Sequence, residues 1–313
     1  MAGRAAATGA TALPRSLQEL TTLSNTDLAE LAPEIRELDA ASRRTSTPFE
    51  GGAKQMTWRE WGQGEPLLLL HGSHGNWMHW LRNIPALAQT RRVIAADMPG
   101  FGESDAPADI ESPADHARAM VEGLRALPGI TGPVDVMAFS LGSLLACYMT
   151  LEAPELFRRL IVVDAGGLGT PVFTADNRSV RGLTGQAVRD VNRHNLGAMM
   201  IHDPARIDET AIDISIYCGR RTKTRVMYHV IPDKLLAVME RVRAPIDVIW
   251  AEFDYIHPDP ELNADVIRTL QPEAELRVVA RAGHWPMYEQ PEGFNAAALD
   301  LLARPARPWL PEA

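Results

Sequence analysis

Cysteine, basic charge and long apolar runs are all scarce in this chain of 313 residues, and each scarcity excludes a class of protein. The two cysteines, Cys147 and Cys218, cannot build a disulfide framework, and neither belongs to a CxxC or Cys/His cluster of the kind that binds zinc. No run of leucine, isoleucine or valine is longer than that from Leu67 to Leu70, whereas a bilayer span needs about 20 apolar residues. The composition therefore indicates a globular protein with no transmembrane segment, no disulfide framework and no metal site.

Acidic residues outnumber basic ones, which gives a formal net charge of −9 and a pI near 5.5. Nucleic-acid binding needs clustered lysine and arginine, so this charge balance disfavours it. The densest basic stretch is "RRTKTR" at 220–225, which we interpret as the solvated face of a helical segment. The opening stretch "MAGRAAATGATALPRS" lacks the apolar core of a secretory signal, so we expect a cytoplasmic protein.

Residues 1–50 are expected to form an N-terminal helical arm. Apolar residues recur at mostly helical spacing through 16–43, Ser16 and Glu19 have the arrangement of a capping box, and Pro33 is expected to start a second helix. Such an arm can pack on the body of its own chain or on a second copy. Packing within the chain is the preferred interpretation, and a homodimer is the alternative.

From about residue 55 the sequence alternates between strand-like and helix-like stretches. Six runs are apolar for four or five residues, which is typical of strands buried on both faces of a parallel sheet: "PLLLLHG", "RRVIAADMPG", "PVDVMAFS", "RRLIVVDAGG", "PIDVIWAEFD" and "ELRVVARAGHW". Helical stretches such as "SPADHARAMVEGLRAL" lie between them. The order predicts an α/β fold, with a mostly parallel open sheet flanked by helices, formed by residues 51–165 and 244–313.

Residues 166–243 interrupt this alternation. They show helical spacing without a convincing buried strand, so they are expected to form a helical insertion between two strands of the sheet. In an open α/β sheet, ligands bind beyond the carboxyl ends of the strands. An insertion at that edge is expected to act as a helical lid.

The stretch "VMAFSLGSLLA" at 136–146 places Ser140 between a strand-like run and a helix-like run. A serine at such a corner is held exposed, as a nucleophile has to be, and Ala138 and Gly142 are small enough to let neighbouring backbone approach. Ala138 stands where the commonest pattern, G-x-S-x-G, has glycine. A serine that begins a helix is also an ordinary N-cap, so this motif alone leaves both roles open.

A serine hydroxyl needs a base to become a nucleophile, and a histidine base needs a carboxylate to hold its tautomer. His284 follows the last strand and a glycine, which places it on a loop at the carboxyl edge of the sheet. Asp254 lies just past "DVIWA" and keeps the chain order serine, aspartate, histidine. Asp164, at the end of "LIVVD", is the alternative acid, because the earlier strand can also supply it.

The attack of a serine on a carbonyl forms a negative oxygen, which needs hydrogen-bond donors. In "LLLLHGSHG" a turn directly follows a strand, so the amide of Ser73 can point at the same spot as the amide of Leu141. One such donor contributes about 3–4 kcal/mol in the transition state. Gly72, His74 and Trp285 are the candidate substrate-binding residues beside these groups.

The motifs "HGSHG", "DMPGFGESD", "AFSLG", "EFD" and "GHW", in this order, resemble those of the α/β-hydrolase fold superfamily. The resemblance implies that Ser140 is the nucleophile, His284 the base and Asp254 the acid. It also implies that the amides of Ser73 and Leu141 are the oxyanion donors. It also implies acyl transfer without a cofactor, with a small molecule as substrate.

The resemblance leaves the substrate open, and we expect first a serine esterase that acts on small or medium apolar esters. "GHW" followed by Glu289 also resembles meta-cleavage-product hydrolases, which cut carbon–carbon bonds in ring-fission products and use a lid arginine to hold a substrate carboxylate. The insertion offers four candidate arginines: Arg178, Arg181, Arg189 and Arg193. However, "HGSHGNWMHW" lacks the Gly-Pro-Gly pattern usual in that subgroup. A non-catalytic small-molecule receptor is the alternative of another class, but a receptor has no need of all three catalytic residue types.

Overall fold

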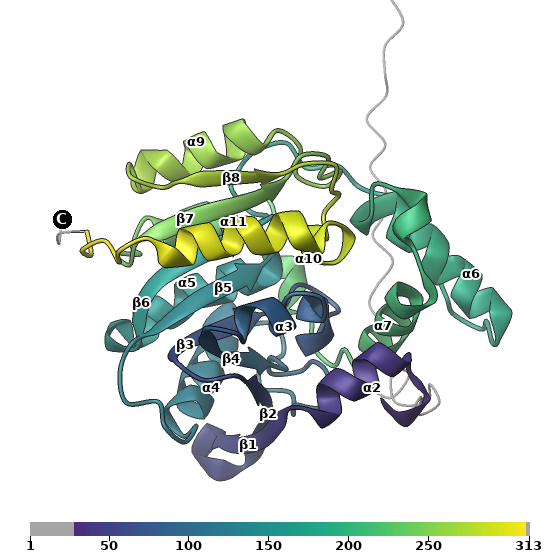
Figure 1. Ribbon diagram of the computed structural model, residues 1–313, viewed down its shortest axis with the longest axis horizontal. Helices are drawn as coiled ribbons and strands as arrows, with labels where there is room; N and C mark the ends of the chain where they lie inside the picture. The colour runs from purple at the N-terminus through teal and green to yellow at the C-terminus, as the bar shows by residue number, and fades with distance from the viewer. Residues whose placement is uncertain (1–27, 311–313) are drawn as a thin grey trace, which may run out of the picture.

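An eight-stranded sheet lies between two layers of helices in the computed structural model, which describes residues 28–310 (Figure 1). Its strand order is β1-β2-β4-β3-β5-β6-β7-β8. The strands are β1 (Arg43–Phe49), β2 (Lys54–Trp61), β3 (Glu65–Leu70), β4 (Arg91–Ala96), β5 (Val134–Phe139), β6 (Phe157–Val163), β7 (Ile246–Ala251) and β8 (Leu276–Val279). β2 is antiparallel to β1 and β4, and the pairs from β4 to β8 are all parallel. The predicted fold class is therefore confirmed.

The sheet carries apolar side chains on both faces, which explains why its central strands are continuous apolar runs. In β3, Leu68 and Leu70 belong to one buried cluster, whereas Leu67 and Leu69 belong to the other. The first cluster is covered by α4 (Pro113–Arg125), α5 (Leu141–Glu152), α8 (Lys234–Met239) and α9 (Pro260–Leu270). The second is covered by α2 (Pro33–Ala40), η3 (Trp77–Trp80), α3 (Ile84–Leu87), α7 (Glu209–Arg220), α10 (Pro286–Glu289) and α11 (Pro291–Ala303).

The N-terminal region differs from the expected helical arm. Helix α2 begins at Pro33 as expected, after the short turn η1 (Leu28–Glu30), but residues 43–49 form the edge strand β1 and not helix. The turn η2 (Glu50–Gly52) then joins β1 to β2. The capping box expected at Ser16 lies outside the described residues.

Helix α2 packs on the body of its own chain. Its Ile35 is fully buried, the indole nitrogen of Trp61 donates to the carbonyl of Leu38, and Arg59 Nε donates to Asp39 Oδ1 at 2.5 Å. The amide of Ala32 also donates to Asp213 of α7 at 3.2 Å. This part of the arm therefore contributes to the core.

The segment between β6 and β7 contains helical turns, and none of its residues, all of which the structure describes, is in a strand. Its elements are α6 (Gln186–Asn195), η5 (Leu196–Met200), η6 (Pro204–Arg206), α7, η7 (Val226–His229) and α8. We call this segment the insertion. Figure 1 shows that α6 projects outward from the body, whereas α7 lies beside α2.

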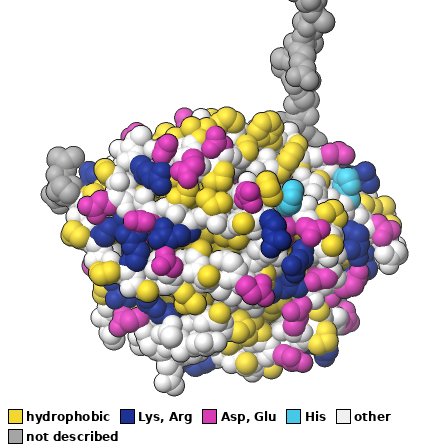
Figure 2. Space-filling model, turned by 45° about the horizontal axis from the view of Figure 1, so that its top comes forward, with side chains coloured by type: hydrophobic (Ala, Val, Ile, Leu, Met, Phe, Trp, Pro, Cys, Tyr) yellow, Lys and Arg dark blue, Asp and Glu magenta, His cyan; other side chains and the backbone are white. Residues whose placement is uncertain are grey.

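Charges of both signs lie on the surface. The face shown in Figure 2 has basic and acidic side chains interspersed with apolar ones. Ion pairs such as Arg277 with Asp300, at 2.8 Å, place opposite charges together at the surface. Among residues 28–310, no helix has the length and apolar character that crossing a membrane requires.

Candidate active site

Ser140 occupies the corner between β5 and α5 with an unusual backbone conformation, φ 50° and ψ −118°. A positive φ is energetically unfavourable for any residue other than glycine, and such strain concentrates at functional sites. The amide of Ser140 donates to Val163 O at 2.8 Å, which extends the β5–β6 pairing to the corner itself. The side chain does not cap α5, so the N-cap interpretation is not what the structure shows.

Glycines allow this corner to approach neighbouring backbone. A Cβ on Gly142 would lie 2.7 Å from the carbonyl oxygen of His71 and 2.9 Å from that of Leu70, so α5 starts directly against the end of β3. A Cβ on Gly72 would lie 3.2 Å from the Cβ of Ser140. The loop after β3 and the corner after β5 are therefore in contact, as the two motifs predict.

His284 joins Ser140 to Asp254. Its Nδ1 lies 2.8 Å from Asp254 Oδ2, and its Nε2 lies 3.3 Å from Ser140 Oγ. Because a carboxylate only accepts hydrogen bonds, Nδ1 carries the proton, and Nε2 is left to accept from the serine hydroxyl. Both His284 and Asp254 are buried, so water competes little for these bonds.

Asp254 is held as a carboxylate. Its Oδ1 accepts hydrogen bonds from the amides of Ile256 at 2.8 Å and His257 at 3.1 Å. Burial raises the pKa of Asp254, but the neighbouring His284, its hydrogen bond and the hydrogen bond from the amide of His257 outweigh this effect, so the net pKa lies below its ordinary value.

A buried glutamate fixes the loop that carries His284. Glu289 Oε2 accepts from the amides of Gly283 at 2.7 Å and His202 at 2.9 Å, and Oε1 accepts from the amide of Asp203 at 2.6 Å. The amide of Trp285 also donates to Met200 O at 2.8 Å. The insertion and the histidine loop are thereby joined through backbone amides and one carboxylate.

The expected oxyanion donors belong to the two segments in contact here, Ser73 to the loop after β3 and Leu141 to the start of α5. None of the hydrogen bonds among residues 28–310 uses the amide of Ser73 or Leu141 as donor, so both remain available for a ligand. Gly72 is buried against Ser140, and His74 is exposed with φ 52°.

The turn after β3 is shaped by buried neutral histidine. His71 Nδ1 donates to Gly72 O at 2.8 Å, and its Nε2 accepts from the amide of Met98 at 3.0 Å. Burial lowers the pKa of His71 to about 4, which matches a ring that donates through one nitrogen and accepts through the other. The amide of Gly72 donates to His79 Nδ1 at 3.3 Å, so a second histidine supports the same turn.

Trp285 was predicted to bind substrate, but the structure packs it in the core. Its ring stacks on Tyr288 with centroids 4.3 Å apart, and its indole nitrogen donates to His79 O at 3.0 Å. Only 1% of the residue is exposed. Trp285 therefore stabilises the region behind His284.

Two of the four candidate arginines of the insertion are occupied by acidic partners. Arg189 pairs with Glu209 and, at 2.8 Å, with Asp213, and Arg193 pairs with Glu209 at 2.5 Å. Arg178 and Arg181 are exposed. Arg189 and Arg193 are therefore already paired with carboxylates of the protein itself.

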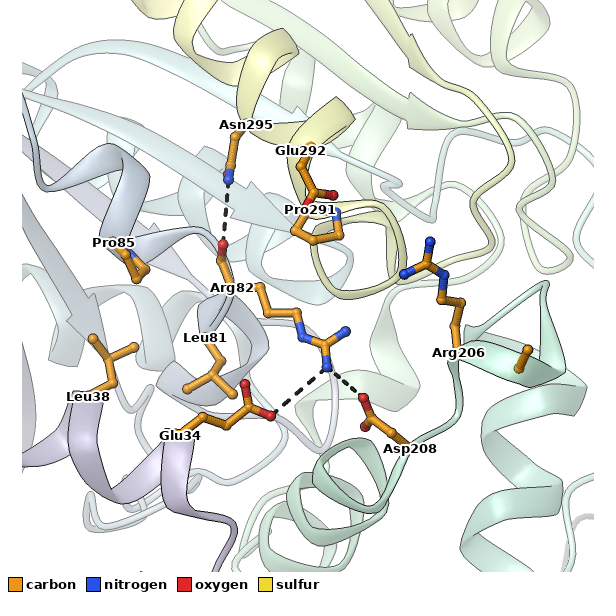
Figure 3. Close-up of a pocket in the computed structure, with 11 residues that line it drawn as sticks. Glu34, Leu38, Leu81, Arg82, Pro85, Arg206, Asp208, Pro291, Glu292 and Asn295 are labelled. Atoms are coloured by element: carbon orange, nitrogen blue, oxygen red, sulfur yellow. Dashed lines mark hydrogen bonds and ion pairs between the residues drawn. The ribbon is translucent and has the colours of Figure 1, made fainter.

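A separate cavity of about 580 Å³ lies away from these groups, between α2, η6 and α11 (Figure 3). Arg82 extends into it, donates to Asp208 at 2.6 Å, lies 4.0 Å from Glu34 and stacks over Tyr288. Its lining includes none of Ser140, Asp254 and His284. Arg82 is therefore paired with acidic side chains of this lining, which also includes Arg206 and Glu292.

Sequence reasoning gave no role to His257 and Glu289 and treated Asp164 only as a substitute acid. Asp164 is fully buried beside Asp254, and the His257 ring lies 5.6 Å from that of His284 between centroids. A strand-end position was the only signal for Asp164, and nothing in the sequence indicated the contacts of the other two. Asp164 and His257 lie beside His284, whereas Glu289 accepts from the amide of the preceding residue, Gly283.

The chain is similar to known proteins over most of its length. The model of the alpha/beta hydrolase family matches residues 67–297. The 2-hydroxy-6-oxononadienedioate/2-hydroxy-6-oxononatrienedioate hydrolase of Comamonas testosteroni is 29% identical over 261 residues, which cover 77% of this chain and 89% of that protein.

Two solved structures show the same fold. The meta-cleavage product hydrolase from Pseudomonas fluorescens IP01 matches with a TM-score of 0.65 at 23% identity, covering 82% of this chain and 97% of its own. A carboxylesterase from Bacillus subtilis matches with a TM-score of 0.69 at 19% identity, covering 86% and 94%. The sheet, the order of the motifs and the matched family together place this chain in the alpha/beta hydrolase family, as a hydrolase.

Proposed function

We propose that this hydrolase uses Ser140 as its nucleophile, His284 as the base and Asp254 as the acid. The observation that carries the proposal is the hydrogen-bonded chain from Ser140 Oγ through His284 to Asp254, built from the carboxyl ends of three different strands. Similar constellations on other folds perform acyl transfer.

Each group then has a defined step. His284 Nε2 takes the proton of Ser140 as the hydroxyl oxygen attacks a carbonyl, and the imidazolium is stabilised by Asp254. The amides of Ser73 and Leu141 donate to the oxygen that becomes negative. His284 gives its proton to the leaving group, and a water activated by the same nitrogen releases the acyl group from Ser140.

We assign a carboxylic ester of a small or medium apolar substrate as the bond that is cleaved. Apolar side chains are exposed on the loop of Asp254 and on the part of the insertion bonded to it: Phe253, Tyr255 and Phe173. The rings of Phe173 and Tyr255 lie 6.2 Å apart between centroids, and the amide of Phe173 donates to Ile256 O at 3.0 Å. An apolar rim of this kind favours an apolar acyl or alcohol group. The acidic partners of Arg189 and Arg193 weigh against a carboxylate ligand at those two positions.

Cleavage of a carbon–carbon bond in a ring-fission product is the second candidate. A specific observation favours it: the Comamonas testosteroni relative, at 29% identity, is a hydrolase of 2-hydroxy-6-oxononadienedioate and the corresponding trienedioate. The same three side chains would serve this reaction, so the choice between the two bonds depends on substrate binding.

Labelling and turnover test the proposal in sequence. A fluorophosphonate probe should modify Ser140 and no other serine, as read by peptide mapping, and Ser140→Ala should abolish both the labelling and the burst of product from a p-nitrophenyl ester. A small-molecule receptor would bind without a burst.

A panel of p-nitrophenyl esters of rising acyl length, compared with one dienoate ring-fission compound, then shows which of the two kinds of bond the enzyme cleaves. Fast cleavage of the dienoate with slow ester turnover would select the carbon–carbon bond.

A further inference from the structure

A second aspartate lies behind the acid of the site. Asp164 follows the last residue of β6, with a positive φ of 43°, and its side chain is fully buried. Its Oδ1 accepts from the amide of Ala251 at 2.8 Å. Its Oδ2 is buried as well and has no hydrogen-bond donor within the described part of the chain.

Asp164 belongs to a cluster with the acid and the base. One carboxylate oxygen each of Asp164 and Asp254 and one ring nitrogen of His284 lie within 4.8 Å of one another. Two carboxylates that share a buried site do not both ionise, because their charges repel and neither is hydrated. One of the two therefore holds a proton at neutral pH.

The surroundings decide which carboxyl is protonated. Burial raises the pKa of Asp164 well above its usual range, and the negative charge of the neighbouring Asp254 raises it further. Asp254 instead accepts from His284 and two amides, all of which favour its charged form. The proton lies on Asp164.

Resting on the proposed function of Ser140, His284 and Asp254, we propose that Asp164 is a positioning residue that stays neutral and donates its O–H to Asp254. This donor gives the buried Oδ2 of Asp164 a partner. It also helps to fix the carboxylate that orients His284, together with the two amides of the Asp254 loop.

The other titratable groups facing the pair agree with a neutral Asp164. They are His284, on the loop after β8, and His257, on the loop after β7. Burial lowers the pKa of His257 to about 4, so it is uncharged at neutral pH and offers no positive charge to an ionised Asp164. His284 already gives its Nδ1 proton to Asp254.

Two substitutions give different pH profiles. Asp164→Asn keeps a neutral donor toward Asp254 and an oxygen for the amide of Ala251, so the acid limb of kcat/KM should stay where it is. Asp164→Ala keeps neutrality but removes the donor, so the carboxylate attracts the imidazolium proton more strongly. The acid limb should then move up by about one pH unit.

If Asp164 were ionised, both substitutions would remove a negative charge and move the acid limb to lower pH. If the side chain of Asp164 served only for packing, neither substitution would move the limb. Either result would overturn the proposal.

A second measurement needs neither turnover nor a stable alanine variant. The infrared carbonyl band of a protonated carboxylic acid should be present in the wild-type protein at neutral pH and disappear in Asp164→Asn. Its absence from the wild type would refute the neutral state of Asp164. The band reads the proton directly, so it remains informative if Ser140 labelling fails, and a failed serine mechanism is thereby distinguished from a failed role of Asp164.

Discussion

Glu289 offers the sharpest test of how the histidine loop is held. In Glu289→Gln one carboxylate oxygen becomes an NH₂ group, so a side chain that accepted from the amides of Gly283, His202 and Asp203 can accept from two of them at most. Hydrogen bonds to a charged acceptor contribute about 1.5–3 kcal/mol each, and an NH₂ facing an amide N–H adds repulsion. The free energy of unfolding should fall by about 2–4 kcal/mol.

The same change should reduce activity more than binding. Gly283 directly precedes His284, and a misplacement of about 1 Å in a catalytic group can cost about 100-fold in rate. We expect kcat on an activated ester to fall by about 10- to 100-fold with little change in KM. Thermal unfolding and steady-state kinetics on the same preparations measure the two effects.

The matched control is Glu292→Gln, which makes the same chemical change at an exposed position near the start of α11. That variant should keep the stability and kcat of the wild type, since it loses no buried hydrogen bond. The reasoning is refuted if Glu289→Gln and Glu292→Gln unfold at the same temperature and turn over at the same rate.

Three more predictions concern other parts of the framework. Gly142→Ala should slow fluorophosphonate labelling and lower the free energy of unfolding, measured with urea, by about 1–3 kcal/mol, because the added Cβ meets backbone. Gly132→Ala, with open space around it, should do neither. His71 has its pKa lowered from 6.5 to about 4, so as the pH falls through this range the unfolded chain binds a proton that the folded protein excludes. That group should cost about 3 kcal/mol of stability between pH 6.5 and 4, and His71→Gln should flatten the pH dependence of urea unfolding. Arg59→Met should lower the free energy of unfolding by about 3–5 kcal/mol, because it leaves the partners of a buried guanidinium, such as Asp39, unpaired.

The sheet could be predicted where its strands are buried on both faces and not where they approach an edge. Leu67–Leu70 is apolar without alternation because its alternate side chains enter two different cores. β1 has the sequence "RRTSTPF" and buries only Thr47 and Phe49, so its pattern looks like a loop. In β2, Arg59 and Glu60 form buried ion pairs. A sequence does not distinguish a buried charged residue from an exposed one, so this strand does not look buried.

The proximity of the side chains proposed to react could be predicted because each follows a strand, and parallel strands end at the same edge of a sheet. Ser140, Asp254 and His284 are such residues, and the structure joins them by hydrogen bonds. Side chains that act through packing gave less signal. Trp285 stands next to His284 in the sequence, but its ring turns to Tyr288, and nothing in a single glutamate at 289 indicates three backbone partners.

The bonds between the insertion and the histidine loop restrict how a substrate can enter. Met200, His202 and Asp203 are tied to Trp285 and Glu289, so swinging residues 200–203 outward would either break these bonds or withdraw the imidazole from the serine. If this segment opened as a lid with these bonds intact, each opening would therefore move His284 away from Ser140. Substrate is therefore expected to reach the serine past residues 174–185, which are mostly exposed and are bonded to α6 and not to the histidine loop.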